Sequence, residues 1–175
     1  YDWSEFEIGL SLAAVGIGSA ISQALLTGYL IKRFGPMRAG LFGLVANAIA
    51  LFLFFLAEAP WMAYAVIFVS AIGGVAMPAI NTITSTLTPR NAQGELQGAQ
   101  ASMMAFTLII SPVLMTQTLQ YFATLPDGHP MKTGGAAFLL AAIITGLAII
   151  PFLVGAGINR RAIAEAATSE AAAAE

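Results

Sequence analysis

Residues 28–40 read GYLIKRFGPMRAG, a short basic turn between two long segments that carry no charged residue. Glycine permits a tight turn, and lysine or arginine near the end of a helix neutralises its free carbonyl groups. The uncharged segments on either side cover residues 8–31 and 39–57. Roughly 20 helical residues cross the hydrocarbon layer of a bilayer, so each segment is long enough to do so once. This region therefore predicts two membrane helices joined by a short loop.

Three more uncharged segments follow, at residues 61–87, 96–125 and 134–158. The 175-residue chain is 58% hydrophobic and 9% charged, whereas soluble domains average about 45–50% and about 25%. A soluble bundle would need charged outer helix faces, and none of the five segments has one. Lipid offers no partners to the backbone, so membrane segments of this length form helices. We expect an all-α, polytopic membrane bundle with five transmembrane helices within residues 1–158.

The distribution of basic residues predicts how the chain is oriented. Loops with more lysine and arginine face the cytoplasm, and six of the seven basic residues fall on one set of connections. These are Lys32, Arg33, Arg38, Arg90, Arg160 and Arg161, against Lys132 on the other set. We therefore expect the N-terminal residues outside and the Ala/Glu-rich tail, residues 159–175, in the cytoplasm. Because the chain starts at Tyr1 and runs directly into a span, we also expect it to be the C-terminal part of a longer protein.

No Asp, Glu, Lys, Arg or His lies in the core of any predicted span. Intramembrane ionisable groups usually mark proton or ion paths, so this chain supplies no proton carrier of its own. Ser19 and Gln23 of the first span are polar, and Gln23 is costly to expose to lipid. Its amide forms either an interhelical hydrogen bond or a substrate contact. In the second span, Gly43, Asn47 and the alanines beside them indicate a closely packed face of small residues.

The third and fourth spans hold further candidates for a binding cavity. Gly73 and Gly74 with Pro78 four residues on predict a helix that packs tightly and then bends, and Asn81 follows the bend. Methionine and aromatic side chains suit an adaptable apolar pocket and are also ordinary core residues. The fourth span contains Met103 and Phe106 of this kind, and the hydroxyl-bearing Thr107 follows Phe106.

The loop at residues 28–40 resembles the G-x-L-x-D-R-x-G-R-R loop of the major facilitator superfamily. Gly28, Leu30, Arg33, Gly35 and Arg38 stand in matching places, while Lys32 occupies the aspartate position and Pro36 that of the next arginine. The sequence QGELQG at residues 93–98 is similar to a loop of the tetracycline-efflux branch of drug–proton antiporters. Further similar stretches lie at residues 8–14, 61–63 and 73–79.

The resemblance implies that the five spans correspond to spans eight to twelve of a twelve-span transporter. It places Gln23, Ser19, Asn81, Met103, Phe106 and Thr107 on the substrate side, and Gly28, Arg33, Gly35 and Arg38 in a gating loop. Asn47 stands where family members often have an acidic residue, so the resemblance carries no coupling role to it. The proton-titrating acids would belong to the missing N-terminal portion.

The function implied by the resemblance is secondary active efflux of a small, tetracycline-like amphipathic drug in exchange for protons, by alternating access. The partners would be the drug, protons, the lipid bilayer of a bacterial inner (plasma) membrane, and the missing N-terminal half. A metabolite symporter of the same fold and a non-transporting five-span subunit remain as alternatives. The sequence shows no enzyme motif, nucleotide fingerprint, metal-ligand cluster or cysteine, and we expect no cofactor and no nucleic-acid partner.

Overall fold

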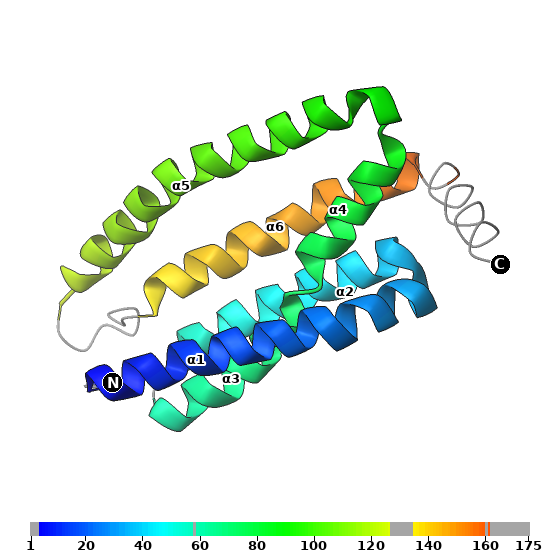
Figure 1. The fold of residues 1–175 in the computed structure, drawn as a ribbon. Helices are drawn as coiled ribbons and strands as arrows, with labels where there is room; N and C mark the ends of the chain where they lie inside the picture. Colours follow the sequence, from blue (N-terminus) through cyan, green and yellow to red (C-terminus); the bar gives the residue numbers. More distant parts are fainter. Residues whose placement is uncertain (1–3, 58, 127–134, 160, 162–175) are drawn as a thin grey trace.

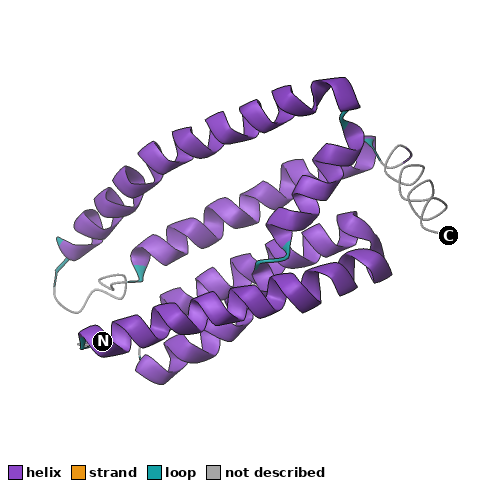
Figure 2. Ribbon diagram, in the orientation of Figure 1, coloured by secondary structure: helices purple, strands orange, loops and turns teal. Residues whose placement is uncertain are grey.

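The computed structural model describes residues 4–57, 59–126, 135–159 and 161. These residues form helices and contain no strand (Figure 2), which confirms the all-α class. The elements in chain order are α1 Glu5–Ile21, the π-helical segment η1 Ser22–Thr27, α2 Gly28–Leu56, α3 Pro60–Gly73, α4 Ala76–Leu87, the short 3-10 turn η2 Arg90–Ala92, α5 Gln93–Ala123 and α6 Ala136–Ile158.

Four helices in the described part of the chain are long and apolar enough to cross a membrane, where five were expected. They are Glu5–Leu56, Trp61–Leu87, Arg90–Ala123 and Ala136–Ile158. The difference arises because the first two expected spans are joined in one helical stretch of 52 residues. Within this stretch the backbone leaves the helical region at Gly35, with φ 80° and ψ 158°. There the chain reverses its direction (Figure 1), so the stretch consists of two arms that run in opposite directions.

The turns gather at the two ends of the bundle. Figure 1 places the reversal between the two arms, the η2 turn and the C-terminal end of α6 at one end. The N-terminal ends of α1, α3 and α6 lie at the opposite end. The basic turns that contain Arg33 and Arg90 are thus on the same side of the bundle, as the alternation of the predicted loops requires.

Small residues bring α2 close to the third predicted span. A Cβ atom added at Gly43 would lie 2.5 Å from the backbone nitrogen of Ala76, and one at Gly73 would lie 2.8 Å from the Cβ of Asn47. Ala39 of α2 is buried with Val75 and Ala79 in the same contact. This confirms the closely packed face predicted around Gly43 and Asn47, although Asn47 forms no hydrogen bond with another described residue.

The bend predicted in the third span is confirmed. Helix α3 ends at Gly73, and α4 begins at Ala76 after a two-residue turn. Pro78 lies in the first turn of α4, where its missing N–H breaks no helical hydrogen bond. The bend directs α4 towards the start of α5 (Figure 1).

Helix α5 contains no buried residue, and large apolar side chains such as Leu108 and Ile109 are about 70% exposed. So much apolar surface needs lipid or other protein to cover it, in agreement with a membrane helix. Of the predicted tail, residues 160 and 162–175 lie outside the described part of the chain.

Candidate functional site

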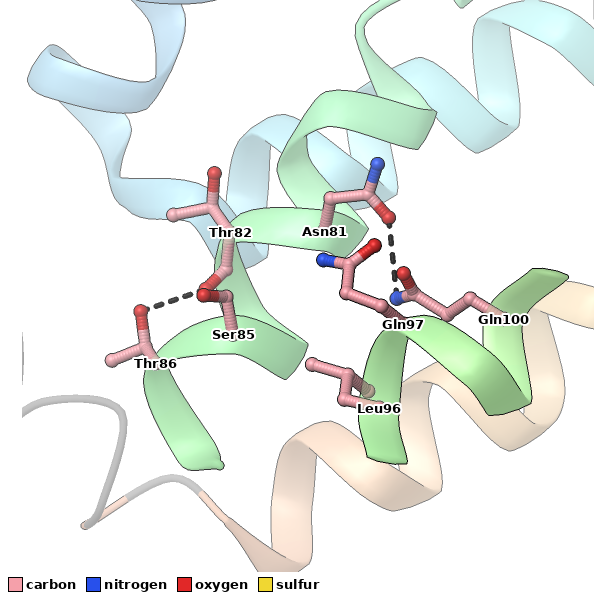
Figure 3. A pocket seen from close by; sticks show the side chains of 7 residues that line it. All are labelled: Asn81, Thr82, Ser85, Thr86, Leu96, Gln97 and Gln100. Carbon is pink, nitrogen blue, oxygen red and sulfur yellow. Dashed lines mark hydrogen bonds between the residues drawn. The ribbon is translucent and has the colours of Figure 1, made fainter. Parts of the chain in front are cut away.

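A polar cleft of about 420 Å³ lies between α4 and the start of α5 (Figure 3). All but one of its lining side chains are polar, and none carries a charge. They are Asn81, Thr82, Ser85, Thr86, Leu96, Gln97 and Gln100. Ligand sites of small molecules commonly measure about 300–1,000 Å³, so the cleft has the size of a site for a small organic molecule.

Helical spacing places these side chains on facing surfaces. Asn81 and Ser85 are four residues apart on α4, and Gln97 and Gln100 are three apart on α5, so each pair lies on one helix face. The η2 turn joins the two helices, and Gln93 fixes their ends. Its Nε2 donates to the carbonyl oxygens of Ser85 at 2.9 Å and Thr88 at 2.8 Å, which satisfies carbonyl groups that a helix end leaves free.

Three carboxamide groups point towards one another across the cleft (Figure 3). The Nε2 of Gln100 donates to Oδ1 of Asn81 at 3.4 Å and to Oγ1 of Thr84 at 3.2 Å, both at or beyond the long end of the N–H···O range. The carboxamide of Gln97 has no hydrogen bond to another described residue. The hydroxyls of Thr82 and Thr86 donate to backbone carbonyls one turn earlier, and their lone pairs stay available as acceptors.

Of the substrate-side residues predicted from the sequence, the structure places Asn81 in this cleft and the others elsewhere. Ser19 is half-buried on α1, and Gln23 is exposed on η1. Met103 and Phe106 are 71% and 66% exposed on α5, and the hydroxyl of Thr107 donates to the backbone oxygen of Met103 at 2.9 Å. Figure 1 shows α6 between α5 and α1. The described residues therefore do not join these candidates into one site.

The sequence analysis did not select Gln97 and Gln100 as site residues. The available signal was the repetition of polar side chains at three- and four-residue intervals on both sides of the Arg90 turn. That pattern becomes a site only when the turn brings the two helix faces together.

The predicted gating loop is exposed at its charged positions. The guanidinium carbon of Arg33 lies 6.0 Å from the ring centres of both Tyr29 and Phe34, at the outer limit of a cation–π contact. Arg33 and Arg38 pair with no carboxylate in the part of the chain that the structure describes. Gly35 forms the reversal, whereas Gly28 continues the helix with ordinary dihedral angles.

Comparison with known proteins identifies the family. The family model of the Major Facilitator Superfamily matches residues 1–173. The tetracycline resistance protein of class C from Escherichia coli is 36% identical over 140 residues, which cover 80% of this chain and 35% of that protein. The class G protein from Vibrio anguillarum is 34% identical, over 80% of this chain and 36% of its own length. The class B protein from Escherichia coli is 30% identical, over 83% of this chain and 36% of its own length.

The chain thus spans about a third of the length of these curated relatives. No solved structure matches it. The comparisons confirm the resemblance seen in the sequence, and they indicate a transporter family and not an enzyme. The chain belongs to the major facilitator superfamily.

Proposed function

We propose that the protein carrying this chain is a secondary active transporter that exports a small amphipathic drug of the tetracycline type in exchange for protons. The observation that carries this proposal is the similarity to tetracycline resistance proteins along 80% or more of the chain. The predicted spans contain no ionisable side chain in their cores. The proton-carrying groups are therefore assigned to the part of the transporter that corresponds to the unmatched length of the relatives.

The proposed topology has five membrane crossings. A straight helix of 52 residues would be about 78 Å long, far more than the roughly 30 Å of a bilayer core, and the reversal at Gly35 divides it into two arms. The basic turns lie at one end of the bundle, and by the positive-inside rule this end faces the cytoplasm. The N-terminal residues are then outside the bacterial inner membrane and the C-terminal end is inside.

The exposed candidates are proposed to face a transport cavity that this chain shares with the rest of the transporter. Alternating access at a site between two halves needs side chains that their own half does not cover. Gln23, Met103, Phe106 and Thr107 are all exposed in the structure. Their exposure supports a place at such an interface, with the methionine and phenylalanine side chains offering an adaptable apolar surface.

Proton exchange is tested in everted membrane vesicles that contain the full-length transporter and are acidified inside. We expect prompt alkalinisation of the lumen when tetracycline is added, because each drug molecule that enters releases protons. A pH-sensitive dye reports the change, and vesicles without the transporter are the control. If the transporter is present, the vesicles are tight and no alkalinisation occurs, drug–proton exchange is wrong and a metabolite becomes the better substrate class.

Replacing Arg33 by alanine is expected to slow tetracycline-driven exchange several-fold while leaving the transporter folded. Arg33 is exposed, and its guanidinium carbon lies 6.0 Å from the ring centres of Tyr29 and Phe34, so its loss removes little packing. In the proposed gate its cation stabilises one closed state by pairing with a carboxylate or a helix C-terminus of the other half. The rate is measured in the same vesicles, with Arg90→Ala as the matched loss of a basic residue. Equal rates in wild type and Arg33→Ala would remove Arg33 from the gate.

A further inference from the structure

We infer that a groove between the C-terminal ends of α4 and α6 binds an acyl chain of an anionic phospholipid, with Arg38 and Arg161 beside the lipid phosphate. The inference rests on the topology in the proposed function, in which this end of the bundle faces the cytoplasm. The partner is a lipid of the cytoplasmic leaflet and is separate from the exported drug.

The groove has a volume of about 210 Å³ and lies where α2, α4 and α6 meet. Most of its lining residues are half-buried and Pro151 is exposed, so the groove opens at the protein surface. The volume is below the roughly 300–1,000 Å³ of sites for drug-sized molecules. Its walls are formed by the apolar residues Met37, Ile80, Ile83, Leu87, Pro151 and Phe152. The groove therefore suits a narrow apolar group.

Two polar side chains line the groove, and both form hydrogen bonds within their own helices. The hydroxyl of Thr84 donates to the carbonyl oxygen of Ile80 at 3.0 Å, and Nδ2 of Asn159 donates to that of Gly155 at 3.0 Å. The interior of the groove is thus apolar, and apolar cavities bind apolar molecules in preference to water. In a membrane helix bundle, the hydrocarbon chain of a lipid supplies such a group.

The groove extends inward from the end of the bundle where α4 and α6 both terminate (Figure 1). Its lining runs from Leu87 back to Ile80 on α4 and from Asn159 back to Pro151 on α6. At a rise of 1.5 Å per residue these stretches are about 10 and 12 Å long. Polar Asn159 is at the outer end, and the inner end is apolar. A lipid has the same order, with its headgroup at the membrane surface and its acyl chain in the hydrocarbon layer.

Positive charge surrounds the outer end of the groove. Arg38 follows the lining residue Met37, and Arg161 lies two residues after Asn159. Both arginines are exposed, and neither pairs with a carboxylate in the part of the chain that the structure describes. Basic residues outnumber the one described carboxylate at this end, Glu95 of α5. Basic pockets between membrane helices on the cytoplasmic side bind anionic headgroups, so the charge favours an anionic lipid over a zwitterionic one.

The test measures lipid binding to the full-length transporter by native mass spectrometry, with phosphatidylglycerol and with phosphatidylcholine of the same acyl chains. We expect phosphatidylglycerol to bind about fivefold to tenfold more tightly than phosphatidylcholine. Arg38→Gln should weaken phosphatidylglycerol binding about fivefold, the effect of one basic residue near a membrane surface, and leave phosphatidylcholine binding unchanged. Arg33→Gln is the matched control, because it removes the same group from the arm before Gly35, which does not line the groove.

A variant that fills the groove tests the acyl chain separately. A Cβ added at Gly155 meets no atom within 4 Å, so Gly155→Leu introduces a side chain into open space at the lining. We expect both lipids to bind about tenfold more weakly, as for the loss of about two buried methylene groups. Gly146→Leu makes the same exchange elsewhere on α6, also with no atom within 4 Å of the Cβ, and should bind both lipids as wild type does. Glycerol 3-phosphate, which lacks acyl chains, should displace neither lipid.

Each other result overturns the inference. Equal binding of the two lipids to wild type, or equal losses in Arg38→Gln and Arg33→Gln, would remove the recognition of the anionic headgroup. Equal binding by Gly155→Leu and Gly146→Leu would place the acyl chain outside the groove. Displacement by glycerol 3-phosphate would show a simple anion site. These failures are separate from failure of the proposed function, which is judged by proton exchange in vesicles, and helical circular dichroism of each variant verifies its fold.

Discussion

Gly43→Ala is expected to destabilise the bundle by about 3 kcal/mol, the upper part of the range for overpacked sites. The new Cβ would lie 2.5 Å from the nitrogen and 2.8 Å from the Cα of Ala76. Both are backbone atoms, so no side-chain rotation relieves the overlap, and α2 must move away from α4. The free energy of unfolding is measured for the chain in mixed micelles by titration with a denaturing detergent, with helical circular dichroism as the signal.

Gly146→Ala on α6 is the matched control, because a Cβ there meets no atom within 4 Å. Alanine favours the helix over glycine by up to about 1 kcal/mol, so this variant should be as stable as wild type or slightly more stable. Equal stability of Gly43→Ala and Gly146→Ala would show that α2 does not pack against Ala76 at this distance.

The close contact at Gly43 illustrates what the sequence predicts well. Small residues spaced by three or four along a membrane segment have few other uses than close helix packing, and the face around Gly43 and Asn47 was expected for that reason. The bend after Gly73 could likewise be predicted from the sequence, because glycines followed by Pro78 weaken a helix at a definite place. Both predictions depend on local residue types, which is why they hold in the folded chain.

Two features of the backbone conformation could not be predicted from the residue types in the sequence. The helical stretch continues through the basic loop, so residues expected to form a connection, such as Lys32 and Arg33, are helical. The segment Ser22–Thr27 is π-helical, and Thr27 donates its hydroxyl to the carbonyl of Ser22 at 3.2 Å. This segment also contacts α3, and a pattern read within one segment does not contain such tertiary contacts.

The candidate site was predicted in part for a similar reason. Asn81 was chosen because it follows a bend, and it does line the cleft. Gln97 and Gln100 were not chosen, because their place in the cleft depends on the η2 turn bringing two helix faces together. Gln23 and Met103 are exposed in the structure, and the cavity role proposed for them requires contacts with the rest of the proposed transporter. A sequence pattern identifies polar residues in a membrane helix, whereas their neighbours come from tertiary packing.

Gly35→Ala is expected to destabilise the bundle by about 2 kcal/mol, within the range of roughly 1–3 kcal/mol for a residue forced into a glycine-only region. Gly35 has φ 80° and ψ 158°, and a Cβ there would meet no atom within 4 Å. The penalty therefore comes from the backbone alone. Pro36 follows, and it restricts the preceding residue to extended angles. Alanine can keep the observed ψ but not the positive φ, so the direction of the chain after the turn changes.

The change in direction separates this prediction from a simple loss of helix. The arms before and after Gly35 must stay antiparallel for Gly40 and Gly43 to reach α4 and α6, so a misdirected turn weakens those contacts while leaving each arm helical. Unfolding in mixed micelles should shift to lower detergent, with unchanged circular dichroism before the transition. Gly16→Ala, at an exposed position of α1 with no atom within 4 Å of its Cβ, should show no such shift. If Gly35→Ala instead matches Gly16→Ala, the reversal does not require a positive φ, and the chain turns between the two arms in another way.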